Sequence, residues 1–115
     1  MYTLWFVKQV VWLGTSLDEV RGWTDEAQRD TGYQLFKIQS GLEPSDWKPI
    51  PSVGSGVQEI RIHCGNEYRV IYLAKLEKAV YVLHAFEKKT RKTPQAARDV
   101  AHRRFQLLLS QRRHT

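Results

Sequence analysis

Cysteine is almost missing from this chain of 115 residues, in which Cys64 stands alone. A single thiol excludes an internal disulfide and a zinc site built from several cysteines, and it is typical of the reducing cytoplasm. The sequence also lacks a catalytic triad, a catalytic pair of carboxylates, a glycine-rich phosphate loop and a zinc-ligand spacing. We therefore expect no metal and no other cofactor.

Long hydrophobic runs are missing as well. The N-terminal segment MYTLWFVKQVVWLGTS is apolar, but Lys8 and Gln9 interrupt it, and neither a basic region nor a small-residue cleavage site flanks it. It is also shorter than the roughly 20 residues that cross a bilayer. We expect it to form a buried first strand of a cytoplasmic protein that does not contact a membrane.

Acidic residues become scarce toward the C-terminus. Residues 1–87 hold nine Lys and Arg against eleven Asp and Glu, whereas residues 88–115 hold nine against one. The net charge of +6 therefore comes from the last quarter of the chain. A positive field at one end of a near-neutral domain attracts polyanions, of which RNA and DNA are the commonest.

Apolar residues are plentiful, at 42% of the chain, and they include four Trp, five Tyr and four Phe. This content, together with the length, predicts a single folded domain over residues 1–115, with residues 111–115 as a loose tail. Alternating and continuous apolar patterns predict strands at residues 5–12, 58–63, 68–74 and 80–86. Residues 41–56 contain three prolines, which predicts a loop.

Helix signals complete the order β-α-α-β-β-β-α. Ser16 with Glu19 is typical of a capping box before a helix over residues 17–23, and Thr24 caps a second helix that ends near residue 40. Gly32 lies in that helix, where we expect it to allow close packing on the sheet. Thr93 and Pro94 open the last helix. The result is an α+β domain with helices packed on a small antiparallel sheet.

Short motifs with a shared order run from about residue 35 to residue 105. In chain order they are IQ with G at 38–41, P at 44, WKP at 47–49, GV and EIRI at 56–62, YRVIY at 68–72, LHAF at 83–86, and KKT and KTP between 88 and 94. This set resembles the RelE/ParE toxin superfamily, and most of all its phage-derived HigB-like branch of type II toxin–antitoxin toxins.

The resemblance implies a RelE-like fold and a ribosome-dependent endoribonuclease that cuts translated mRNA without a metal. In such enzymes the 2′-hydroxyl of the substrate attacks the adjacent phosphorus. The protein then supplies a cation to the strained phosphate, a base near the 2′-oxygen and an acid near the leaving 5′-oxygen. The resemblance also implies two partners, mRNA on the ribosome and a cognate antitoxin, often of helix-turn-helix type.

Four residues match the catalytic positions of the family. Arg69 matches the arginine that faces the scissile phosphate, and Arg61 matches a second basic position. Lys88 and Lys89 lie at the strand end where relatives carry the groups that move protons. This chain has no histidine at that strand end, so the acid and the base stay open; a lysine serves as a base only if its pKa falls.

Each of these residues also has a purely structural interpretation. Arg69 lies in an apolar strand and is either functional or a buried partner of Glu59 or Glu87; Glu59 is either a base or that partner. A two-residue turn at Gly65–Asn66 places Arg61 and Arg69 on opposite faces of the sheet, whereas a three-residue turn places them on the same face. The joint assignment therefore predicts a bulge near Cys64–Asn66.

Further basic residues are candidates for RNA binding: Lys48, Arg91, Lys92, Arg103 and Arg104. Arg91 and Lys92 lie between a strand end and a helix cap, and we place Arg103 and Arg104 on the exposed side of the last helix. There they contact ribosomal RNA, an acidic antitoxin surface, or nothing. His84 is interpreted as a core histidine, and His63 carries no site signal.

Two other functions stay open. The first is a ParE-like toxin of the same fold that poisons DNA gyrase and cuts no RNA. The second is an inactive binding module that acts only in transcriptional control. Gyrase poisons generally lack the basic constellation at the strand end, so its presence here favours the nuclease.

Overall fold

The computed structural model describes residues 7–76 and 78–113. The elements in chain order are β1 (Gln9–Trp12), α1 (Ser16–Arg21), α2 (Asp25–Gln39), β2 (Trp47–Pro49), β3 (Val57–Cys64), β4 (Asn66–Leu73), β5 (Ala79–Lys88) and α3 (Gln95–Arg113). The predicted α+β class is confirmed, and so is the predicted order of elements apart from the short strand β2. Residues 5 and 6 of the predicted first strand lie outside the described residues, and that strand begins at Gln9.

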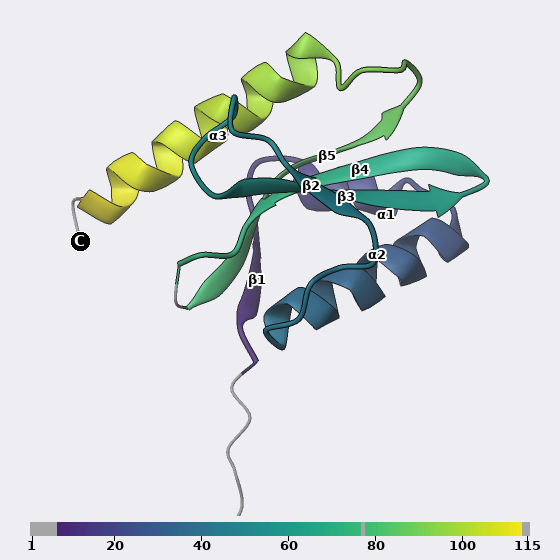
Figure 1. The fold of residues 1–115 in the computed structure, drawn as a ribbon, viewed down its shortest axis with the longest axis horizontal. Helices are drawn as coiled ribbons and strands as arrows, with labels where there is room; N and C mark the ends of the chain where they lie inside the picture. Colours follow the sequence, from purple (N-terminus) through teal and green to yellow (C-terminus); the bar gives the residue numbers. More distant parts are fainter. Residues whose placement is uncertain (1–6, 77, 114–115) are drawn as a thin grey trace, which may run out of the picture.

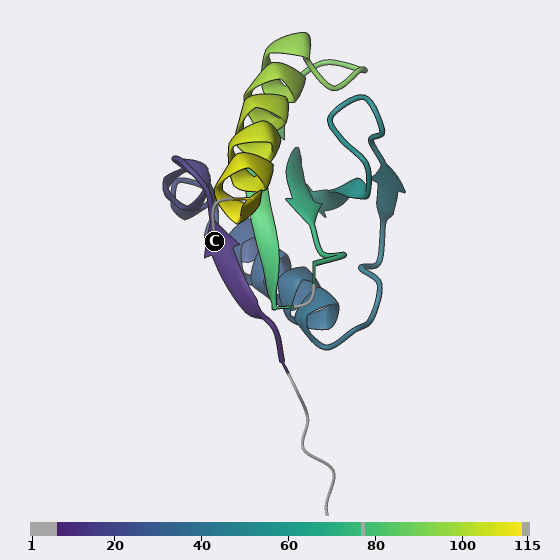
Figure 2. The ribbon, with the colours of Figure 1, turned by 90° about the vertical axis from the view of Figure 1, so that its left-hand side faces the viewer.

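The five strands form one sheet in the order β1-β5-β4-β3-β2. β2, β3, β4 and β5 pair in antiparallel fashion, whereas β1 pairs with β5 in parallel, which corrects the expectation of a wholly antiparallel sheet. No hairpin links β1 to β5, because helices α1 and α2 and strands β2, β3 and β4 lie between them in the chain. Turn geometry therefore does not impose an antiparallel direction on this pair. Figure 2 shows β1 at one edge of the sheet and β2 at the other.

The helices cover opposite faces of the sheet, with α1 and α2 on one side and α3 on the other (Figure 1). The first core joins α1 and α2 to Ile60, Ile62 and Val70 of the sheet. The second joins α3 to Val57 and Leu83. Side chains alternate between these faces along each strand. The sheet face that α3 covers is only partly apolar, and it also carries the polar residues described below.

Strand β2 was not expected, because the three prolines of residues 41–56 favoured a loop throughout. Trp47, Lys48 and Pro49 pair with Ile60, Glu59 and Gln58 of β3. Proline is tolerated here because β2 is an edge strand, where one side of the backbone needs no ladder partner.

Helix caps follow the prediction at Thr24, whose hydroxyl accepts a hydrogen bond from the Ala27 amide at 3.2 Å. The predicted capping box of Ser16 and Glu19 is wrong. Thr15 is the N-cap of α1 and makes no side-chain cap, and the Ser16 hydroxyl donates to the Val82 carbonyl instead. Gly32 is exposed, and a Cβ there would meet no atom within 4 Å, so it does not serve sheet packing.

The last helix begins at Gln95, and the Pro94 carbonyl accepts its first bond from the Arg98 amide at 3.1 Å. Thr93 does not cap it, because its hydroxyl donates to Glu59. The helix runs to Arg113, beyond the start of the expected tail at residue 111. Within residues 7–76 and 78–113, no helix combines the length and the apolar content that a membrane crossing needs.

Candidate functional site

The β3–β4 hairpin brings the two predicted arginines together. Arg61 pairs directly with Arg69, and the ladder continues to Cys64 opposite Asn66. Only Gly65 lies between those last two residues, and its φ of 79° is one that glycine adopts readily. The predicted bulge is therefore replaced by a one-residue tip. A tip of one residue, like the predicted turn of three, places Arg61 and Arg69 on the same face, since directly paired residues share a face of the sheet.

Two lysines lie on the same face. Lys48 of β2 pairs with Glu59 of β3, two residues before Arg61. Lys88 of β5 pairs with Glu67 of β4, two residues before Arg69. Because residues two apart on a strand share a face, four cations gather on the α3 side of the sheet. We call Lys48, Arg61, Arg69 and Lys88 the cationic cluster.

The electrostatics of Lys88 report how close these charges are. Partial burial lowers the pKa of Lys88, and the positive charges of Arg69, Lys48 and Arg61 lower it further, while Glu59 opposes them. A lowered pKa brings an ammonium group closer to the range in which it exchanges protons near neutral pH.

Glu59 holds the centre of the cluster and is completely buried. Its Oε1 lies 3.7 Å from Arg69 Nε and 3.9 Å from Lys48 Nζ. Its Oε2 accepts a hydrogen bond from the Thr93 hydroxyl at 2.9 Å. Between the two interpretations of Glu59, base or partner of Arg69, the contacts are those of the partner. Thr93 at the same time ties the start of α3 to the sheet.

Arg69 is the most deeply placed cation, with 6% of its side chain exposed. Its Nη1 donates to the Tyr68 carbonyl at 2.9 Å and to Glu67 Oε1 at 3.1 Å. Its carboxylate partners are Glu59 and Glu67, rather than Glu87. Arg69 is thus paired, and its accessible side is covered by an exposed carboxylate that can move.

Buried hydrogen-bonding capacity remains unused in this cluster. Among the described residues, Arg69 Nε, Arg61 Nε and Glu59 Oε1 are buried and have no hydrogen-bond partner. Buried polar atoms are normally satisfied, and exceptions often mark places where water or a ligand binds. The floor of the cluster therefore keeps donors for a bound group.

An acidic rim, which sequence reasoning missed, surrounds the arginines. His63 Nε2 lies 2.7 Å from Asp46 Oδ2, and His63 Nδ1 lies 2.8 Å from Glu67 Oε2. Asp46 Oδ1 is also 3.6 Å from Arg61 Nη1. The hairpin register places Glu67 opposite His63, and the pairing of β2 with β3 brings Asp46 to the other side of the ring.

The rim is a set of mutually stabilised charges. Hydrogen bonds to Asp46 and then to Glu67 raise the pKa of His63. The hydrogen bond from His63 is in turn the main cause that lowers the pKa of Asp46 and that of Glu67. A carboxylate at each ring nitrogen favours the doubly protonated imidazole, and the two acids also serve as counter-ions to the arginines.

Lys89 lies apart from the cluster, although the sequence grouped it with Lys88. It is 81% exposed, and its Nζ is 3.6 Å from Glu87 Oε2. Glu87 pairs with Tyr68, which belongs to the core under α1 and α2, so this pair is on the opposite face. The geometry brings three of the four predicted catalytic residues together.

His84, interpreted from the sequence as a core histidine, is half-buried. It stacks on Phe86 at a ring distance of 5.5 Å, and burial, aided by the charge of Arg104, lowers its pKa to about 4. Arg104 does not lie on the exposed side of α3 as expected. Its Nη1 donates to the Leu83 carbonyl at 2.9 Å, because this position of the helix turns toward the sheet. Arg103 is exposed.

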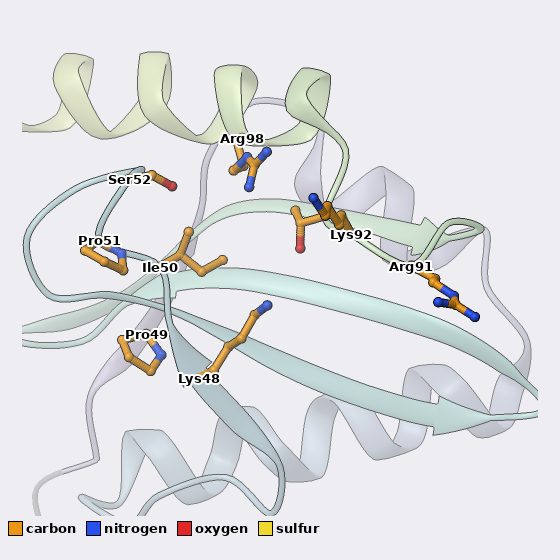
Figure 3. Close-up of a pocket in the computed structure, with 9 residues that line it drawn as sticks. Lys48, Pro49, Ile50, Pro51, Ser52, Arg91, Lys92 and Arg98 are labelled. Atoms are coloured by element: carbon orange, nitrogen blue, oxygen red, sulfur yellow. The ribbon is translucent and has the colours of Figure 1, made fainter.

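Of the other predicted RNA-binding residues, Lys48 belongs to the cluster, and Arg91 and Lys92 lie beside it. Lys48, Arg91 and Lys92 line one pocket between β2 and the start of α3, which Figure 3 shows. In the described parts of the chain, no three or more His, Cys, Asp or Glu side chains are arranged to hold a metal.

The fold and this face define a small α+β domain with a RelE-like arrangement of its elements. The family model described as Phage derived protein Gp49-like (DUF891) matches residues 18–106, and the chain belongs to this family. Gp49-like proteins are relatives of the RelE- and HigB-like toxins. No curated protein matches the chain significantly.

Proposed function

We propose that this protein is the toxin of a type II toxin–antitoxin pair and belongs to the HigB-like branch. In this proposal it is an endoribonuclease that needs no metal and cuts mRNA while the ribosome translates it. One observation carries the proposal: Arg61 and Arg69 face each other across β3 and β4, with Lys48 and Lys88 on the same face. Family membership supports it.

The chemistry fits a cationic surface that holds one strained phosphate. The substrate 2′-oxygen loses its proton and attacks phosphorus, the bond to the 5′-oxygen breaks, and that oxygen takes up a proton. The products carry a 2′,3′-cyclic phosphate and a 5′-hydroxyl. Guanidinium groups bind phosphate oxygens through paired N–H donors and stabilise the extra negative charge of the transition state.

The site is closed by its own counter-ions in the free protein. A phosphate that binds the arginines takes the place of Glu67 at Arg69 and of Asp46 at Arg61. Both carboxylates are exposed enough to swing away, at 43% and 40%. Lys88 is the best-placed group for proton transfer, because its pKa is lowered and it lies on the same face.

Its proposed partners are mRNA on the ribosome and a cognate antitoxin, of the helix-turn-helix type common in this branch. A cationic face whose own carboxylates are partly exposed fits an inhibitor whose acidic side chains take their place at the arginines.

Primer extension on a reporter message tests the function. The protein is expressed with two reporters that differ only in the start codon, so that one is translated and the other is not. We expect strand breaks inside the reading frame of the translated message alone. An intact message with stalled replication would contradict the proposal and favour a gyrase poison.

A further inference from the structure

A second cationic site adjoins the cluster. It is a pocket of ≈ 330 Å³ between residues 48–52 and the start of α3, and its lining residues are Lys48, Pro49, Ile50, Pro51, Ser52, Arg91, Lys92, Thr93 and Arg98. In Figure 3, Lys48 rises from β2 and Arg98 descends from α3, so that their charged ends approach the same space from opposite walls. Sequence reasoning did not single out Arg98.

The charge of this pocket is one-sided. Four of its nine lining residues are Lys or Arg, and none is Asp or Glu. The acidic group nearest Lys48 Nζ is the buried Glu59, at 3.9 Å. The Arg98 guanidinium donates a hydrogen bond to the neutral Gln95 side chain, and no carboxylate of the described residues forms an ion pair with Arg91, Lys92 or Arg98. An anion therefore finds the charges of Arg91, Lys92 and Arg98 without a carboxylate partner in the described part of the chain, unlike those of Arg61 and Arg69.

Apart from Lys48, the pocket wall formed by residues 48–51 is apolar. Pro49 and Pro51 are exposed there, next to the buried side chain of Ile50. Cations beside an exposed apolar surface match a nucleotide, which carries a phosphate and an apolar base face, better than they match a bare anion.

The two walls are held rigidly against each other. Ile50 and Val53 are buried in the core with Phe105 of α3. His102 Nδ1 lies 2.8 Å from the Val53 carbonyl, and the backbone at Gly54 is so close to the Phe105 ring that a Cβ would come within 2.4 Å of it. The pocket is thus formed before any ligand arrives, which reduces the entropy lost on binding.

The pocket and the cluster are parts of one surface. Lys48 and Thr93 line the pocket, and both also contact Glu59 at the centre of the cluster. We infer that the pocket binds the phosphodiester and nucleoside that neighbour the cut on the same RNA strand, with Arg98 and Lys92 as phosphate contacts. This inference rests on the proposed function, because it takes the substrate to be single-stranded RNA.

Direct binding tests the pocket without requiring cleavage. The full-length protein is titrated with a short single-stranded RNA that is 2′-O-methylated at every position, so that no 2′-hydroxyl can attack, and fluorescence anisotropy is followed at several salt concentrations. The test variant is the double change Lys92→Gln with Arg98→Gln. The control is Arg21→Gln with Arg29→Gln, which removes the same charge from exposed positions of α1 and α2.

We expect the test variant to weaken binding by about tenfold or more and to reduce the steepness of log K against log salt by about 1.4, as the loss of two phosphate contacts to a single strand requires. The control should change the affinity by less than about twofold. The single change Arg98→Lys in the wild-type protein keeps the positive charge and should retain most of the wild-type affinity. Thermal unfolding of each variant shows that it is folded.

Wild-type affinity and salt slope in the test variant would overturn the inference, and so would an equal loss in both double variants, which would reflect net charge alone. These results are separable from those for the proposed function. If the wild type cuts translated mRNA while the test variant binds RNA normally, only the pocket inference fails. If the test variant loses RNA binding but the wild type never cuts, only the nuclease fails.

Discussion

Glu59 is the residue on which the position of Arg69 depends. Replacing it by Gln keeps the shape and the bond to Thr93 but removes the buried charge between Arg69 and Lys48. We expect Glu59→Gln to lower the free energy of unfolding by about 2 kcal/mol, since it leaves a buried cation with less compensation. Urea denaturation measures this.

The matched control is Glu43→Gln, which changes an exposed carboxylate away from the cluster. It should stay within about 0.5 kcal/mol of the wild type. Equal stability of Glu59→Gln and wild type would show that Glu59 does not hold the cluster.

His63 gives the acidic rim a defined pH dependence. The raised pKa of His63 stabilises the fold below its ordinary value of 6.5, and this contribution is lost as the pH rises through the raised value. The lowered pKa values of Asp46 and Glu67 stabilise the fold above 3.8 and 4.5, and this is lost as the pH falls. The contribution is therefore largest between about pH 4.5 and 6.5.

We expect the difference in unfolding free energy between wild type and His63→Gln to be largest near pH 5.5 and to shrink toward pH 9. Because the groups are exposed, the difference stays below about 1 kcal/mol. Chemical denaturation at a series of pH values measures it, and the titration of His84 cancels because both proteins contain it. A difference that grows toward pH 9 would contradict this account of the rim.

At this scale the sequence showed which cations matter but not which acids surround them. Arg69 could be predicted because a single charge in an apolar strand must be paired or functional. Asp46 and His63 lie 17 residues apart and meet only because β2 joins the sheet next to β3. No local pattern contains that contact.

The segment of residues 50–56 and helix α3 depend on each other at Gly54. A methyl group there would come within 2.4 Å of the buried Phe105 ring. We expect Gly54→Ala to lower the free energy of unfolding by about 1–3 kcal/mol through overpacking. Thermal and urea unfolding both measure this loss.

Gly32→Ala is the matched comparison, because a Cβ in this exposed part of α2 meets nothing within 4 Å. It should raise the free energy of unfolding by about 0.5–1 kcal/mol. If both substitutions shifted stability in the same direction, the packing account of Gly54 would be wrong.

Helices and central strands were predictable at the scale of elements because their signals are local. The last helix is one example. The apolar residues Ala97, Val100, Ala101, Phe105 and Leu108 recur at helical spacing, and all of them are buried except Val100, which is half-buried. The strand β2 and the parallel pairing of β1 were not predictable. Both are edge strands whose existence and direction depend on the partner, and short edge segments carry little propensity of their own.

At the scale of the whole molecule, cations that are far apart in the sequence lie on one face. Lys48, Arg61, Arg69, Lys88 and Arg98 come from four strands and a helix, yet they border one continuous surface beside α3. The sequence located the excess charge at the C-terminus, but three of these five cations come from earlier strands. The fold, rather than the charge count, therefore sets where a polyanion binds.

The most direct test of the central claim is the rate of message cleavage on programmed ribosomes, measured in single-turnover conditions for wild type, Arg61→Gln, Arg69→Gln and the exposed control Arg29→Gln. Removing one transition-state contact should slow cleavage by about 10²-fold or more in the first two variants and leave Arg29→Gln at the wild-type rate. Wild-type rates in folded Arg61→Gln and Arg69→Gln proteins would contradict the claim that this paired cationic surface performs the reaction.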